Sequence, residues 1–537
     1  MDRKDKDKRI KNQGEEEFST DDFHFEGFDN ESNRSSSDSS RKRGSYDDDL
    51  DNTRTDMGTG VVRKKRRNVE TNVIALIFVG IFAVMIIYFA HFNAKVAPDL
   101  TTSPYNPRVT TTAPPNPIRR GSIFAKDGSV LAATYLNADG KEYRSYPKGE
   151  LFAVPVGMER GGGSGIEGSF YEDLNTATNK VVVDEEASNI DKTEFQGNNV
   201  YTTLSTYLQE VAFDALGDEK GAIIAMEPST GKILAMVSKP TYDPNKGGTD
   251  YDEWAQMNGE DSVLLNRATQ GLYPPGSTFK IMTALEYLKE EPGEFHDTSF
   301  HCEGTVQPAG GARVNCQYPH GDENVDTAFT VSCNVAFSTI GLRLDRNAFR
   351  ALAENFGFNQ DSPLEEVETT KSRFYINGQS EMSEVQAVSY GQGSTLETPL
   401  QNLLISATVA NGGTMMKPYL VEKVLSPDGD LVKNFVPKVY RENLASEEQC
   451  KEIANMMYNM VNNGLEDVYG SNPYYVAGKT GTAEYESNSD HAHMWFTCFA
   501  PYNNPQIAVV CIMERTEIDY TKATTACKKV IDAYFSD

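Results

Sequence analysis

The first residues able to carry chemistry are Ser277 and Lys280, a hydroxyl and an amine three positions apart. A Pro-Pro-Gly turn at 274–276 precedes them, and the apolar run at 281–285 predicts a helix. Residues i and i+3 of a helix share a face, so the two side chains would lie together, near the helix N-terminus where an oxyanion is favoured. A buried lysine loses its preference for the ammonium form and can take the proton of a serine. Because the pair also occurs at exposed helix starts, further motifs must decide.

Two further motifs turn this pair into an ordered set, Ser332-Cys333-Asn334 and Lys479-Thr480-Gly481-Thr482. S-x-x-K, S-x-N and K-T-G in this order resemble the motif set of the penicillin-binding proteins and serine β-lactamases. The resemblance runs from about residue 201 to the C-terminus. Other segments that carry it are 221–228, 230–238, Asn266-Arg267-Ala268, Gly391-Gln392-Gly393, Thr398-Pro399, 410–413 and 493–496.

The resemblance implies a role for each residue of the two serine motifs. Ser277 would be the nucleophile that attacks the carbonyl between the two terminal D-alanines of a peptidoglycan stem peptide. Lys280 would be its base, provided that burial and Lys479 lower its pKa, and which of the two lysines removes the proton stays open. Ser332 would relay a proton to the leaving amine. Asn334 would hydrogen-bond the substrate backbone and Lys280.

The third motif would grip the substrate. On an edge strand, Lys479 would hold the site positive within an acidic domain. The resemblance implies that the hydroxyls of Thr480 and Thr482 hold the terminal carboxylate, and that the backbone N–H groups of Ser277 and Thr482 form the oxyanion hole. Gly481 has a reason of its own, because a side chain there would obstruct a ligand laid along the strand.

The elements that must position these motifs indicate a mixed α/β fold. Ser205 is a predicted N-cap for an amphipathic helix at 208–216, and Trp495 is interpreted as a core residue. The resemblance implies an antiparallel five-stranded sheet flanked by helices, with an inserted all-helical subdomain that carries both serine motifs. The predicted strands are 222–226, 233–237, 475–482, 495–500 and 507–513, and the predicted closing helix is 522–535.

The region before this domain divides into a tail, an anchor and a pedestal. Residues 1–70 are charged and polar without an apolar period, which predicts a disordered cytoplasmic tail. Residues 71–92 include a stretch of 20 residues without Lys, Arg, Asp or Glu, enough to cross about 30 Å of hydrocarbon. Residues 93–200 begin as a Pro- and Thr-rich linker and continue into a small pedestal. The domain of residues 201–537 would be the transpeptidase.

Two segments of the pedestal narrow the resemblance to class B penicillin-binding proteins. Residues 119–132 are similar to the R-G-x-I entry segment of that class, with a departure at Ala125-Lys126. Gly165-Ile166-Glu167-Gly168 is similar to the G-x-E segment that follows it. We therefore expect a class B-like D,D-transpeptidase with a small pedestal.

Charge orients the anchor and limits the partners. The cluster Arg63-Lys64-Lys65-Arg66-Arg67 precedes the apolar stretch, and only Lys95 follows it before Arg108. The positive-inside rule therefore predicts a cytoplasmic N-terminus and an extracytoplasmic catalytic domain. A cleaved signal peptide would need a shorter charged region than these ~70 residues. The formal net charge of −27 argues against nucleic acid or an anionic membrane surface as a partner.

The seven cysteines all follow the anchor, and their odd number prevents complete pairing within the chain. Cys302 and Cys316 flank a predicted hairpin, so a disulfide between them stays open. His301 and His320 would permit a Cys/His zinc site there, but the spacing fits no standard one. Cys333, inside the S-x-N motif, is interpreted as packing. We predict no metal and no cofactor.

The resemblance implies a single-pass membrane enzyme that cross-links stem peptides through a serine acyl-enzyme and is acylated by β-lactams. A D,D-carboxypeptidase and a β-lactam-binding sensor use the same motifs and are the alternatives. A β-lactamase is disfavoured because the class A pattern E-x-x-L-N is absent, and a sensor would carry several spanning segments. A glycan-polymerising domain needs roughly 150–200 residues, more than the region 93–200 offers. The expected partner is therefore a polytopic glycosyltransferase.

Overall fold

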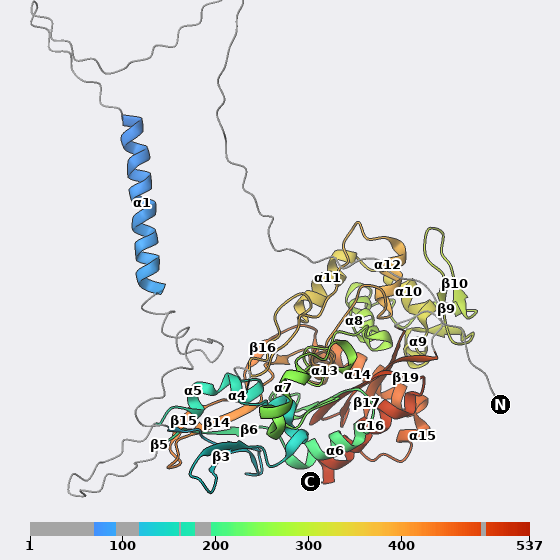
Figure 1. Ribbon diagram of the computed structural model, residues 1–537. Helices are drawn as coiled ribbons and strands as arrows, with labels where there is room; N and C mark the ends of the chain where they lie inside the picture. Colours follow the sequence, from blue (N-terminus) through green and yellow to red (C-terminus); the bar gives the residue numbers. More distant parts are fainter. Residues whose placement is uncertain (1–68, 93–117, 161–162, 178–194, 485–489, 537) are drawn as a thin grey trace, which may run out of the picture. The chain divides into compact units, whose positions relative to one another are not determined.

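The computed structural model describes residues 69–92, 118–160, 163–177, 195–484 and 490–536 (Figure 1). Most of the predicted tail, at 1–68, and the linker at 93–117 lie outside these ranges. Helix α1 (Val69–His91) covers the predicted anchor. Its stretch Val73–His91 has a mean hydropathy of 2.9 and is, among the described residues, the one helix long and apolar enough to cross a membrane.

An antiparallel sheet carries the K-T-G motif on its edge strand. Its strands in spatial order are β17 (Ala477–Ala483), β18 (His491–Ala500), β19 (Ile507–Glu517), β7 (Gly221–Met226) and β8 (Ile233–Lys239). Each of them overlaps a predicted strand. All six residues of β7 are buried, because both faces of the sheet are covered and the strand is apolar throughout. The fold thus joins strands from the two ends of the domain into one sheet.

Helices cover both faces of this sheet (Figure 1). One face is covered by α6 (Thr206–Leu216) and α16 (Tyr520–Ser536), and the other by α13 (Pro399–Ala410) and α14 (Glu447–Gly464). The Ser205 hydroxyl accepts a hydrogen bond from the Leu208 N–H at 3.2 Å and caps α6, as predicted. The predicted closing helix is confirmed as α16.

The chain between β8 and β17 is not the all-helical subdomain that the sequence suggested. Its longer helices in the region of the serine motifs are α8 (Lys280–Glu290), α9 (Val325–Thr330), α10 (Asn334–Arg343), α11 (Arg346–Asn355) and α12 (Met382–Ser389). Two antiparallel strand pairs lie among them, β9 (Ser299–Cys302) with β12 (Gly321–Asn324) and β10 (Thr305–Val306) with β11 (Val314–Asn315). Burial alternates along β9, which is the period of a strand, and Gly304 takes a positive φ of 88°. This segment therefore forms strands and turns rather than a helix. The predicted hairpin between Cys302 and Cys316 is confirmed.

A second, six-stranded sheet forms the pedestal. In spatial order it contains β15 (Leu431–Asn434), β14 (Val421–Leu425), β6 (Asn199–Thr202), β2 (Ile123–Phe124), β3 (Val130–Leu136) and β4 (Glu142–Ser145). Strands β14 and β15 follow α13 in the chain, and β14 pairs with β6. The expected boundary at residue 200 therefore falls inside β6, and the pedestal takes part of its sheet from the 201–537 region.

A buried ion triad joins the two pedestal segments that resemble class B proteins. Glu167 is fully buried and forms ion pairs with Arg120 and Arg144, each with a nitrogen–oxygen distance of 2.7 Å. Arg144 Nη1 also donates to the Gly121 carbonyl at 2.7 Å. A Cβ on Gly121 would lie 1.9 Å from the Asn198 carbonyl oxygen, so a glycine is needed at this position. The two segments are distant in sequence but form one polar centre, because a buried carboxylate needs charged partners.

Candidate active site

Ser277 lies in a short 3-10 turn, η5 (Gly276–Phe279), that leads directly into α8. Gly276 has a φ of +56°, and a Cβ there would lie 2.7 Å from the Thr482 carbonyl oxygen. Its N–H donates to the Gly391 carbonyl at 2.9 Å. Glycine is therefore required both by the left-handed backbone and by the close approach of β17. The turn places the serine beside the edge of the sheet.

Lys280 reaches back from the start of α8 to the serine motifs. Its Nζ lies 3.0 Å from Ser277 Oγ, 3.1 Å from Ser332 Oγ and 2.8 Å from Asn334 Oδ1. It also donates to the Ser332 carbonyl at 2.6 Å. The side chain is fully buried. The predicted i, i+3 pairing of Ser277 with Lys280 is therefore present, and a single amine connects both serine motifs.

The S-x-N motif forms the junction between α9 and α10. Ser332 has a positive φ of 60°, an uncommon conformation for a residue with a side chain. Cys333 is the N-cap of α10, and its Sγ accepts the Ala336 N–H at 3.3 Å. Asn334 begins the helix and donates through Nδ2 to the Asn315 carbonyl at 3.0 Å. This geometry turns the Ser332 hydroxyl and the Asn334 amide oxygen toward Lys280.

Lys479 enters the same network from β17. It is fully buried, and its Nζ donates to Ser332 Oγ at 3.0 Å. Ser277 Oγ, Lys280 Nζ, Ser332 Oγ and Lys479 Nζ therefore form a continuous hydrogen-bonded chain. Thr480 is half-buried on the same edge strand. The structure thus joins the three motifs that the sequence placed far apart.

The reason given for Gly481 from the sequence is wrong. A Cβ on this residue would lie 2.7 Å from the Pro275 carbonyl oxygen and 3.0 Å from Thr278 Cγ2. The space beside Gly481 is therefore filled by the serine turn of the protein itself, not by a ligand. Glycine allows β17 to pack closely on η5, while Thr482, half-buried on the next position, lies beside Gly276.

Burial controls the charges of the two lysines. It lowers the pKa of Lys280 to about 7, against an opposing effect of Cys333, Cys316 and Glu323. Burial first, and then the charge of Lys280, hold the pKa of Lys479 well below its usual range. Burial is the main cause of both shifts, and the repulsion between the two buried amines opposes the presence of two ammonium ions in the site. A neutral amine is available beside Ser277 near pH 7, so the site can remove a hydroxyl proton without any other base.

Three supports of this site were not assigned by sequence reasoning. The Asn315 carbonyl holds Asn334, and nothing in its exposed hairpin signals that. The Gly391 carbonyl accepts the Gly276 N–H and so holds the serine turn. In the sequence, this contact was indicated only by the motif Gly391-Gln392-Gly393, which carries part of the family resemblance. Trp495 is a core residue as predicted, but its Nε1 also donates to the Pro274 carbonyl at 3.0 Å. These contacts fix the turn and the junction that present the two serines.

Two stretches of the chain match known domain families. Residues 221–532 match the penicillin binding protein transpeptidase domain, which is more than half of the 537 residues. Residues 120–200 match the penicillin binding protein A dimerisation domain. The second match coincides with the part of the pedestal that precedes the catalytic domain in sequence.

Individual relatives agree with these matches. The peptidoglycan D,D-transpeptidase PbpA of Mycolicibacterium smegmatis is 32% identical over 427 residues, which cover 74% of this chain and 84% of the relative. MrdA of Haemophilus influenzae, also named a peptidoglycan D,D-transpeptidase, is 28% identical and covers 74% of this chain and 66% of its own length. Penicillin-binding protein A of M. tuberculosis, solved as an imipenem acyl-enzyme complex, has a TM-score of 0.69 at 29% identity, over 78% of this chain and 98% of that one.

A further solved structure, the D,D-transpeptidase domain of a peptidoglycan glycosyltransferase from Eggerthella lenta, has a TM-score of 0.70 at 29% identity and covers 78% of this chain and 98% of that one. The family match spans the sheet, the helical insertion and all three motifs. These motifs meet in a single hydrogen-bonded site. The chain therefore belongs to the penicillin-binding protein transpeptidase family.

Proposed function

We propose that this chain is a peptidoglycan D,D-transpeptidase in which Ser277 forms an acyl-enzyme with a stem peptide. The observation that carries the proposal is the 3.0 Å contact between Ser277 Oγ and the buried amine of Lys280. Relatives named PbpA and MrdA are peptidoglycan D,D-transpeptidases. Penicillin-binding protein A of M. tuberculosis forms acyl-enzymes with imipenem and penicillin G, which supports acylation of this chain by β-lactams.

The acylation step uses the hydrogen-bonded chain in order. Neutral Lys280 takes the Ser277 proton, and Oγ attacks the carbonyl carbon between the two terminal D-alanines. The backbone N–H groups of Ser277 and Thr482 stabilise the oxyanion. The C–N bond then breaks, and Ser332, which contacts both lysines, passes a proton to the leaving D-alanine amine. The product is an ester on Ser277.

The second half of the reaction returns the serine. The amine of an acceptor stem peptide attacks the ester carbonyl and gives a proton to the same relay, which returns one to the serine oxygen as the ester C–O bond breaks. Asn334 orients the donor backbone. The terminal carboxylate of the donor binds at Lys479, Thr480 and Thr482. Because burial opposes the ammonium form of Lys479, the incoming carboxylate supplies the negative charge that favours it.

The decisive measurement is the product formed by the full-length chain in detergent from glycan strands that carry stem pentapeptides. We expect cross-linked dimers after muramidase digestion and mass spectrometry, together with released D-alanine. Release of D-alanine without dimers would make the chain a D,D-carboxypeptidase. Penicillin labelling without either product would make it a β-lactam-binding sensor. The Ser277→Ala variant is the control and should form neither product.

We propose that the glycan strands come from a separate enzyme. Between α1 and the matched transpeptidase region, only residues 92–119 and 201–220 fall outside the dimerisation match. A polymerising domain needs roughly 150 residues or more. We propose a polytopic glycosyltransferase as partner, docked through α1, whose Gly80 and Ala83 would permit close helix packing. In the same assay, lipid-linked precursor alone should give no dimers, and addition of such a glycosyltransferase should restore them.

We also propose that α1 anchors the chain with its N-terminus in the cytoplasm and its catalytic domain outside. The basic cluster at 63–67 before α1 supports this orientation. A membrane-impermeant thiol reagent applied to intact cells should modify a cysteine introduced at Ser103 and not one introduced at Ser45. The native cysteines are buried or half-buried, so the unmodified chain gives the background. Labelling at Ser45 alone would reverse the orientation.

A further inference from the structure

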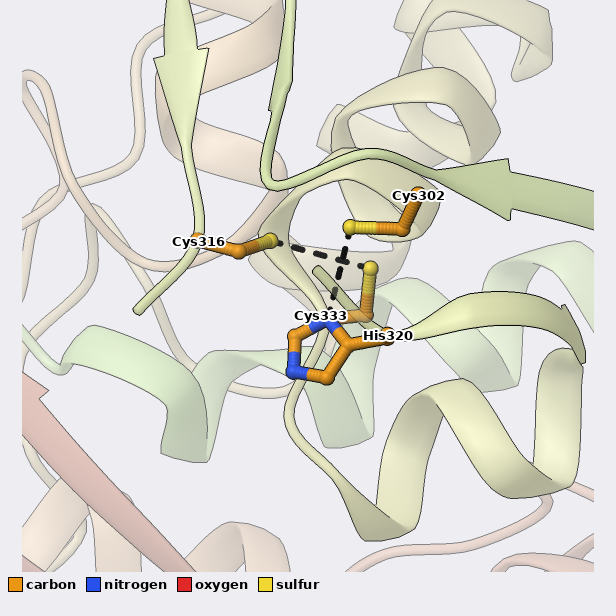
Figure 2. Close-up of side chains that lie close together, drawn as sticks. All are labelled: Cys302, Cys316, His320 and Cys333. Atoms are coloured by element: carbon orange, nitrogen blue, oxygen red, sulfur yellow. Dashed lines mark hydrogen bonds between the residues drawn. The ribbon is translucent and has the colours of Figure 1, made fainter. Parts of the chain in front are cut away.

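Four side chains beside the active site point toward one another: Cys302, Cys316, His320 and Cys333 (Figure 2). Their sulfur and ring nitrogen atoms all lie within 4.8 Å of one another. Cys302 ends β9, Cys316 follows β11, His320 precedes β12, and Cys333 caps α10. All seven cysteines carry free thiols in the structure, so the disulfide left open between Cys302 and Cys316 is absent.

The distances in this cluster are those of ligands around one ion. The sulfur atoms of Cys316 and Cys333 are 3.8 Å apart, and Cys302 Sγ lies 3.4 Å from His320 Nδ1. Two thiolates bound to a tetrahedral zinc ion at about 2.3 Å lie about 3.8 Å apart, and a thiolate and an imidazole nitrogen about 3.5 Å. A disulfide would need a sulfur–sulfur distance of about 2.05 Å. The two pairs therefore correspond to edges of a coordination tetrahedron.

The backbone around the cluster is arranged to stabilise thiolates. Each of the three sulfurs accepts a backbone N–H: Gly304 N–H to Cys302 at 3.4 Å, Val335 N–H to Cys316 at 3.4 Å and Ala336 N–H to Cys333 at 3.3 Å. Hydrogen bonds to ligating sulfurs orient them and are a general feature of thiolate metal sites. Cys302 and Cys333 are also fully shielded from solvent, at 1% and 0% exposure. Packing alone would not require donors at all three sulfurs.

We propose that Cys302, Cys316, His320 and Cys333 bind a structural zinc ion. Three thiolates and one imidazole are a soft donor set that favours zinc over magnesium or calcium. Four protein ligands leave no open position for a substrate or water, so the ion has a structural role. The spacing fits no standard zinc motif because the ligands come from two strand pairs and a helix cap. This proposal replaces the expectation of no metal. The Cys/His site that was set aside from the sequence included His301, which is exposed and bonds Asp322, and it did not include Cys333.

The position of Cys333 connects this ion to the reaction. Its neighbours on either side are Ser332 and Asn334, which both contact Lys280. Cys316 follows Asn315, whose carbonyl holds the Asn334 amide. The ion would thus clamp the β10–β11 hairpin onto the S-x-N junction and fix Ser332 in its left-handed conformation. The four ligands are positioning residues, because they act through Ser332 and Asn334.

Metal content tests the site without reference to the proposed reaction. The full-length chain, purified under reducing conditions without chelator, should contain about one zinc ion per chain when measured by inductively coupled plasma mass spectrometry. Cobalt should replace it and give the visible absorption of tetrahedral thiolate coordination. The variants Cys302→Ser and His320→Ala should lose most of the metal. Cys450→Ser, which removes another buried free thiol, on α14, should keep it.

Several results would overturn the proposal. These are a reduced chain that holds no zinc and gives no cobalt spectrum, equal metal content in Cys302→Ser and Cys450→Ser, or a native Cys316–Cys333 disulfide found by peptide mass spectrometry. For the positioning role, His320→Ala should slow acylation by a fluorescent penicillin roughly tenfold, and chelation followed by zinc addition should lower and restore the rate in the native chain. An acylation rate that does not change when the bound zinc is removed would contradict the positioning role. The zinc content of the native chain and its variants tests whether the four residues bind the ion.

Discussion

The Ser277→Ala variant is expected to lose covalent labelling by a fluorescent penicillin completely. Acylation requires an oxygen at this position, and Ser277 Oγ lies 3.0 Å from the Nζ of Lys280 at the start of α8. The other hydroxyl in contact with Lys280, Ser332 Oγ, is shared with Lys479 and sits on a strained junction. Because Ser332 lies at the α9–α10 junction and contacts both lysines, we assign it the role of a proton relay rather than that of a substitute nucleophile. The measurement is fluorescence of the denatured chain after gel electrophoresis.

A matched control separates this loss from a folding defect. Ser338→Ala removes a hydroxyl from α10, where Ser338 is buried and bonds only the Val335 carbonyl at 3.0 Å among the contacts described. This variant should label like the native chain, and both variants should unfold at similar temperatures. If the Ser277→Ala variant still formed a covalent adduct, peptide mapping of that adduct would identify another nucleophile and contradict the proposed mechanism.

Much of the sheet could be predicted because its signals are local. Residues 222–226 and 507–513 are continuous apolar runs of strand length, and the structure buries them on both faces as β7 and β19. The Ser277–Lys280 pair was equally readable, because its geometry depends on a single helical turn. Ser205 showed its capping role through its residue type and the apolar period that follows. In each case, the residues that determine the local structure lie within one short stretch of the sequence.

The remaining features depend on contacts between distant segments. Strand β14 pairs with β6, more than two hundred residues earlier, and no periodicity specifies that partner. Gly481 is a glycine because of the Pro275 carbonyl, which only the packed structure brings beside it. Sequence reasoning considered Cys302, Cys316 and His320 together but left out Cys333 for the same reason. Cys333 is distant in sequence from Cys302 and His320, and only the folded chain brings their side chains together.

Lys280→Met should slow acylation by roughly 10²-fold or more, because it removes the base while keeping the volume of a fully buried side chain. The remaining amine, Lys479, contacts Ser332 rather than Ser277 among the hydrogen bonds described, so it cannot take the proton directly. The measurement is the second-order rate of penicillin acylation by stopped-flow fluorescence. Lys289→Met makes the same substitution at the other end of α8, where the side chain is partly exposed, and should leave the rate unchanged.

The pH dependence of that rate tests whether Lys280 itself is the base. With its pKa lowered by burial to about 7, Lys280 is an ammonium ion at lower pH and cannot accept the serine proton. The native rate should therefore rise about tenfold per pH unit below pH 7 and level off above it. The Lys289→Met control should keep this inflection, and Lys280→Met should lose it. An inflection that persisted in Lys280→Met would assign the titrating base to Lys479 acting through Ser332, since that lysine is the other amine in the hydrogen-bonded chain.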